Sequence, residues 1–88
     1  MTKELTYKMR HTVTSKIKIN QAVIEQVTDE WRSMFYDLKS PADVIEHIAY
    51  NLLQGRRLSQ LDGFANLPNS YAVLVGEPEY ECEEIQRV

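Results

Sequence analysis

Near its start the chain alternates between apolar and polar residues, and this alternation constrains the fold more than any other feature. From position 5 to position 19, every even residue is polar or charged, and every odd residue except His11 and Ser15 is apolar. A period of two is typical of a β-strand with one face on a core and the other in water. Because strands usually have about five or six residues, we expect a bulge or bend near Thr14 and Ser15.

Helical periodicity follows the alternating segment. Apolar residues at steps of three and four predict helical structure over residues 21–38, with Asn20 as the N-cap. Thr28, followed by Asp29 and Glu30, has the pattern of a second helix start, because a hydroxyl caps well and acids suit a first turn. Two alternatives stay open: one continuous helix, or two pieces with a break near Thr28.

The clearest helix boundaries are predicted around residues 41–53. Ser40 suits the N-cap, Pro41 suits the first helical position, and Gly55 can close the helix with a positive φ. The next segment has apolar residues at every third position, which predicts an irregular chain that keeps returning to the core. Its apolar members are Leu58, Leu61, Phe64 and Leu67.

Two strands are expected near the C-terminus. Residues 71–75 are apolar at both parities, which favours a central strand. Residues 79–87 are acidic, which suits an edge strand protected by its charge. The predicted fold is α+β, a single domain over residues 1–88. Its small antiparallel β-sheet contains the long N-terminal strand and the C-terminal strands, and two helices pack on the apolar face, in the order β-α-α-β(-β).

Several classes of protein are excluded by composition. The longest apolar run has five residues, too few to span a membrane, and the first six residues lack the apolar core of a signal peptide. We therefore expect a cytoplasmic protein with no membrane partner. Cys82 is the only cysteine, which excludes an intrachain disulfide, and we expect a buried or half-buried structural thiol. The three glycines are isolated, so there is no glycine-rich phosphate loop.

No pattern of residues points to catalysis. We expect His11 to be a hydrogen-bonded histidine in the core or at its rim, and the helical face of His47 offers no ligand partner except Asp43, which is better explained as a cap. A pairing of either histidine with Cys82 is geometrically feasible, but no nucleophile motif surrounds the cysteine. The expectation is therefore a non-enzymatic protein with no catalytic residue, no cofactor and no metal site.

Charge is strongly segregated along the chain, although the net charge is only −3. Residues 1–19 carry five basic residues and one acid, whereas residues 70–88 carry five acids and one basic residue. Either each end meets a partner of opposite charge, or the two ends pair with each other across an antiparallel ladder. We favour the ladder.

Two sets of residues are candidates for binding a partner. The first consists of acids on the first helical segment and the last strand, with one tyrosine beside the helical stripe: Asp29, Glu30, Tyr36, Glu79, Glu81 and Glu83. The second is a basic strand face that could contact nucleic-acid phosphates: Lys8, Arg10, Lys16 and Lys18. Nucleic acid is the less favoured partner, because the chain is acidic overall and the basic face lacks aromatic residues for stacking.

Two stretches, Thr28–Tyr36 and Leu61–Pro68, resemble segments of small hypothetical proteins of tailed phages and prophages. In general shape, with a basic strand, two helices and an acidic tail, the chain is similar to small phage proteins that disarm host machinery, anti-CRISPR proteins among them. The resemblance covers about a third of the chain and defines no site, so no functional residue carries over. It implies a non-enzymatic binder aimed at a host protein complex.

The sequence therefore favours a protein-binding module, an inhibitor of a host defence complex that acts through a charged surface. The alternatives are a small nucleic-acid-binding accessory protein that uses the basic face of residues 5–19, and a phage structural or assembly protein. A homodimer is also expected, because a long strand in a small domain leaves an unpaired edge. Dimerisation would cover that edge, or the apolar remainder of Leu58, Leu61 and Phe64.

Overall fold

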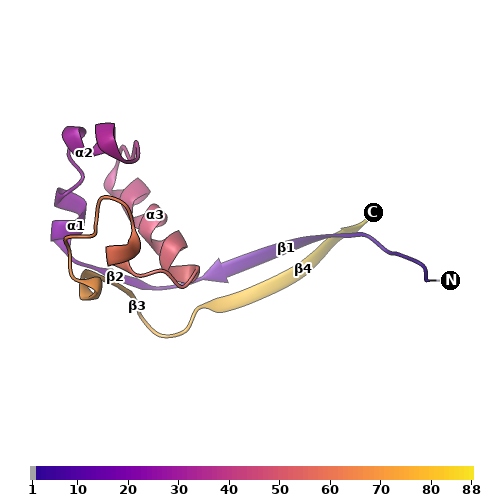
Figure 1. Cartoon of the computed structure of the whole chain (residues 1–88). Helices are drawn as coiled ribbons and strands as arrows, with labels where there is room; N and C mark the ends of the chain where they lie inside the picture. The colour runs from indigo at the N-terminus through magenta and orange to yellow at the C-terminus, as the bar shows by residue number, and fades with distance from the viewer. Residues whose placement is uncertain (1) are drawn as a thin grey trace.

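The computed structural model describes residues 2–88 and confirms the α+β class. Within those residues the order of elements is two strands, three α-helices, two single turns of 3-10 helix and two further strands (Figure 1). Their bounds are β1 Tyr7–Thr14, β2 Ile17–Ile19, α1 Gln21–Glu25, α2 Asp29–Met34, α3 Pro41–Leu53, η1 Leu58–Gln60, η2 Asn69–Tyr71, β3 Ala72–Leu74 and β4 Glu79–Arg87.

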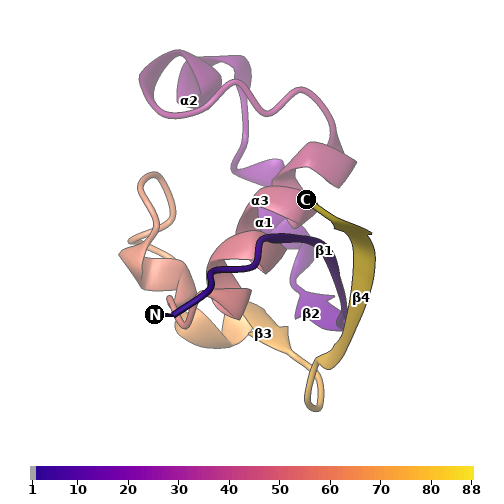
Figure 2. The ribbon, with the colours of Figure 1, turned by 90° about the vertical axis from the view of Figure 1, so that its right-hand side faces the viewer.

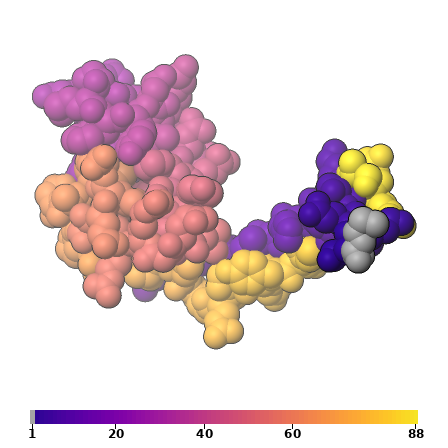
Figure 3. Space-filling model, turned by 45° about the vertical axis from the view of Figure 1, so that its right-hand side comes forward, coloured from indigo at the N-terminus to yellow at the C-terminus, as the bar shows by residue number. Residues whose placement is uncertain are grey.

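The strands form two separate antiparallel sheets of two strands each. β2 pairs with β3 under the helices, and β1 pairs with β4 in a ribbon that leaves them. We call the β1–β4 ribbon the arm and residues 17–74 the body. Figure 1 shows the arm extending to one side of the body, with both chain ends towards its tip. The molecule measures 57 × 30 × 23 Å along its principal axes, and the arm accounts for the long dimension (Figure 3).

A bend separates the arm from the body, where the sequence predicts one. Only residues 15–16 join β1 to β2, whereas residues 75–78 join β3 to β4, so the two connections cannot stay in register. Gly76 adopts a φ of +72°, and Pro78 has no N–H to donate to a ladder. The last bond before the bend runs from the Val75 N–H to the Lys16 carbonyl, at 2.8 Å.

The core lies entirely in the body. Helices α1, α2 and α3 contribute to it together with the irregular segment after α3, which folds back against them (Figure 2). As the spacing of three predicts, Leu58, Leu61 and Phe64 are buried there. The option of a dimer through these three residues is therefore wrong. The core residues are Val23, Val27, Trp31, Val44, Ile48, Leu58, Leu61, Phe64 and Ala72.

The helix boundaries follow from their caps. Of the two alternatives for residues 21–38, the broken helix is confirmed, because Thr28 caps α2 and its Oγ1 accepts a hydrogen bond from the Trp31 N–H at 3.2 Å. Ser40 caps α3 by accepting from the Asp43 N–H, also at 3.2 Å. After α3, Gly55 takes a φ of +84°.

Two expectations about the strands are wrong. The odd residues of β1 do not pack on a core, since Tyr7, Met9 and Val13 remain 42–43% exposed. The bend directs β1 away from the helices, which therefore cover only the short β2–β3 sheet. Residues 71–75 do not form a central strand either: β3 pairs only with β2, and Val73 remains 38% exposed.

Candidate functional site

One face of the arm is charged along its length. Directly opposite residues in an antiparallel pair point to the same side of the sheet. The register places Arg10 opposite Glu83, Thr12 opposite Glu81 and Thr14 opposite Glu79. The predicted pairing of the basic start with the acidic end is thereby confirmed. We call this side the charged face; its members are Lys8, Arg10, Thr12, Thr14, Glu79, Glu81, Glu83 and Gln86.

The carboxylates of the charged face form a row along β4. Every second residue of a strand points the same way, so Glu79, Glu81 and Glu83 are spaced about 6.8 Å apart. Over residues 2–88, ion pairs join only Arg32 to Asp29 and Lys39 to Asp37, both in the body. Glu79, Glu81 and Glu83 are exposed, and none of them is held in an ion pair.

The other side of the arm is largely apolar, and we call it the apolar face. Its cross-strand pairs are His11 with Cys82 and Val13 with Tyr80, and Tyr80 is 69% exposed. Met9 lies opposite Glu84, next to a bulge in the ladder. The members of the apolar face are Tyr7, Met9, His11, Val13, Tyr80, Cys82, Glu84 and, opposite Tyr7 at the tip, Arg87. Cys82 is exposed, so the expectation of a buried or half-buried thiol is wrong.

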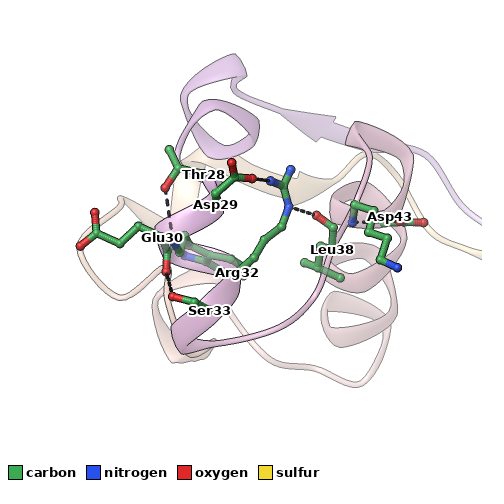
Figure 4. A network of polar contacts seen from close by, with 9 residues as sticks. Thr28, Asp29, Glu30, Arg32, Ser33, Leu38 and Asp43 are labelled. Atoms are coloured by element: carbon green, nitrogen blue, oxygen red, sulfur yellow. Dashed lines mark hydrogen bonds and ion pairs between the residues drawn. The ribbon is translucent and has the colours of Figure 1, made fainter.

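The acids of α2 lie far from the acids of the arm, at the opposite end of the body (Figure 1). Asp29 is paired with Arg32 at 2.7 Å, and the same guanidinium donates through Nε to the Leu38 carbonyl at 2.6 Å (Figure 4). Ser33 donates to the Glu30 carbonyl at 2.7 Å. Asp29 and Glu30 therefore serve the first turn of α2, where acids offset the helix dipole. The structure does not bring the two acidic groups together.

Tyr36 belongs to a polar hollow in the body that sequence reasoning did not find. Its ring lies 4.6 Å from the ring of His47, centroid to centroid, and partial burial lowers the pKa of His47. Arg56 donates to Asn51 Oδ1 at 2.8 Å on the same wall. The hollow has a volume of about 300 Å³. Its residues come from three separate segments, so no local motif in the sequence announces it.

The basic residues proposed to contact nucleic acid are divided by the bend. Lys8 and Arg10 share the charged face with three of the four glutamates of β4. Lys16 lies in the bend, and Lys18 lies on β2 opposite Val73. A carboxylate beside a cation lowers the positive potential that phosphates would meet. The arm thus presents mixed charge rather than a uniformly basic strand.

Two further features concern the described residues as a whole. None of the helices in residues 2–88 has the length and apolar character needed to cross a membrane. No group of three or more His, Cys, Asp or Glu side chains in the same residues is placed to hold a metal ion. Comparison of the chain with known protein families, with curated proteins and with solved structures finds no match.

Proposed function

We propose that this protein is a non-enzymatic protein-binding module and that the arm is its binding element. The observation that carries the proposal is the row of exposed glutamates, Glu79, Glu81 and Glu83, on a ribbon that projects from the body (Figure 3). A projecting ribbon can enter a groove that the broader body cannot. The partner is a host protein with a basic surface, because clustered carboxylates attract such a surface over long range.

A basic groove that normally holds nucleic acid fits this row of acids. Closely spaced carboxylates present a potential similar to that of phosphates, so the arm would compete for the groove and inhibit the host complex. Inhibition of this kind needs no catalytic residue on this chain, since occupancy alone blocks the groove. Threonines opposite Glu79 and Glu81 leave those two carboxylates without a cation directly across the ladder.

The resemblance to small phage proteins supports an inhibitor of phage or mobile-element type. Its two stretches, Thr28–Tyr36 and Leu61–Pro68, pack against each other in the body: the Trp31 and Phe64 rings lie 5.0 Å apart, and the Trp31 Nε1 donates to the Gly63 carbonyl at 2.9 Å. The resemblance therefore concerns the scaffold. On this proposal, the arm carries the residues that recognise the target.

The direct test is capture of a bacterial protein by the immobilised chain, compared between two charge-reversed variants. The arm variant carries Glu79→Lys, Glu81→Lys and Glu83→Lys. The matched control carries Glu25→Lys, Glu46→Lys and Asp62→Lys, which reverse three exposed acids of the body and change the net charge by the same amount. We expect the wild type and the control to capture the same protein and the arm variant to lose it. Capture by the arm variant would refute the proposal.

Nucleic-acid binding gives a contrasting result on DNA-cellulose. On the proposed function, the protein flows through the column even at low salt, because the acids of the charged face oppose phosphate contact. Retention with a steep dependence on salt would instead favour the accessory-protein alternative and assign binding to Lys8, Arg10, Lys16 and Lys18.

A further inference from the structure

The apolar face of the arm has no covering layer. An isolated two-stranded ribbon is marginally stable in water, and ribbons of this kind usually gain stability from a third strand or from packing on another element. In this chain the helices cover only β2 and β3, and Tyr7, Met9, Val13 and Tyr80 are all exposed. These exposed apolar side chains lie together on one side of a projecting element, where another chain can cover them.

The edges of the arm do not offer a symmetric alternative. In a two-fold dimer each edge strand meets its own copy. Pairing of β1 with a second β1 would gather the Lys8 and Arg10 cations of both copies on one side of the enlarged sheet, and pairing of β4 with a second β4 would set two acidic rows opposite each other. Like charges across a ladder are destabilising. Pairing of β1 with a second β4 is complementary in charge but does not close, so it leads to open chains.

We propose that a second copy of this chain covers the apolar face, with the two arms stacked face to face and antiparallel. The two-fold axis passes near His11 and Cys82, at the middle of the face. This register places Val13 over Met9 of the second copy and Tyr80 over Glu84 of the second copy, so no two like charges meet. An axis at Met9 would place the two Glu84 carboxylates together, which the charge disfavours.

This arrangement leaves each body at its own end of the stacked arms, so the bodies need not collide. It also leaves both charged faces on the outside, where their glutamates stay accessible. The dimer does not depend on the proposed function, because it follows from the apolar face and the charged edges alone. If both hold, one particle displays two rows of carboxylates on opposite sides.

The size of the face sets the strength of the association. Eight residues at about 3.4 Å each and two strands about 4.8 Å apart give a face of roughly 27 by 10 Å. Such a face is smaller than the roughly 800 Å² per partner of a standard stable interface. We therefore expect a weak, reversible dimer that is visible only in concentrated solution.

Sedimentation velocity of the purified protein tests the dimer with adjacent substitutions on opposite faces. Val13→Lys places a charge on the apolar face, and Thr12→Lys places the same charge on the charged face, opposite Glu81. We expect the wild type and Thr12→Lys to shift with concentration from the 10.3 kDa monomer towards twice that mass. Val13→Lys is expected to stay monomeric. A wild type that stays monomeric up to about 500 µM would overturn the proposal.

Cross-linking tests the register and does not depend on a variant that weakens the dimer. A short bismaleimide reacts with Cys82, the only cysteine, and should join two copies across the proposed axis. The control moves the thiol to the other face by combining Cys82→Ser with Glu81→Cys. Equal cross-linking of the two proteins would overturn the register. If the wild type is monomeric and the Val13→Lys variant no longer captures the bacterial protein, the partner and not a second copy covers this face. That result would contradict the dimer and leave the proposed function standing.

Discussion

At the scale of single residues, the body depends on one close approach between two distant parts of the chain. Trp31 on α2 packs over the backbone of Gly63, and the Gly63 carbonyl accepts hydrogen bonds from Trp31 Nε1 and from the Gln26 side chain. Gly63 also has a φ of +88°, a conformation that side-chain-bearing residues rarely adopt. The turn at Gly63 thus allows Trp31 to reach the core beside Phe64.

Gly63→Ala is expected to destabilise the protein strongly. A Cβ at this position would lie 2.6 Å from three atoms of the Trp31 ring, so the ring would have to move. Because the strain of the positive φ adds to this clash, we expect the free energy of unfolding to fall by about 2–4 kcal/mol, measured by urea denaturation. Gly55→Ala is the control, because Gly55 has a φ of +84° and open space around it; its cost should be about 1 kcal/mol. Equal costs would contradict the packing argument.

His47 should make stability depend on pH. Burial lowers its pKa in the folded state below the ordinary value of 6.5, so the unfolded chain binds the proton more readily. The contribution of neutral His47 to the free energy of unfolding is therefore fully present above about pH 6.5. It is lost as the pH falls through the lowered pKa of the folded state. Replacing His47 with Gln should flatten this part of the profile between pH 7 and about pH 5, measured by urea denaturation. An unchanged slope in His47→Gln would exclude His47 as its source.

At the scale of elements, the boundaries with a local chemical cause could be predicted from the sequence. Ser40 and Thr28 could be predicted as N-caps because their hydroxyls accept hydrogen bonds from the first turn of a helix. The bend near Ser15 follows from the unusual length of the alternating segment. The exposure of β1 could not be predicted. Alternation shows that one face of a strand is apolar, but a core and an uncovered interface demand the same pattern. Whether helices reach that face is decided by the distant bend at Gly76 and Pro78.

The difference between arm and core can be measured with two truncations. Ile48 on α3 is fully buried, and Ile48→Ala should lower the free energy of unfolding by about 2–5 kcal/mol. Val13→Ala removes apolar atoms from an exposed strand and should cost less than about 1 kcal/mol in dilute, monomeric protein. Urea denaturation checks both values. A cost at Val13 equal to that at Ile48 would mean that a core covers β1.

At the scale of the whole molecule, the middle of the chain forms the packed core, whereas its two ends carry the segregated charges. The middle forms a body whose core holds the helices, and the two ends pair into an arm that adds nothing to that core. The position of the acids at Glu79, Glu81 and Glu83 could be predicted, because strand parity fixes which residues share a face. The separation of these acids from α2 could not, because it depends on the bend. The hollow at Tyr36 and His47 could not be predicted either, since the segments that form its walls come together only after folding.

On the proposed function, the arm binds its partner through its acids. The most direct measurement is the association rate with the purified captured protein at a series of salt concentrations. The wild type and the Glu25→Lys, Glu46→Lys, Asp62→Lys control should associate at similar rates that fall with salt. The Glu79→Lys, Glu81→Lys, Glu83→Lys variant should associate at least about tenfold more slowly at low salt and lose that dependence. Equal rates for the two reversed variants, or a slower rate for the body variant alone, would contradict the claim.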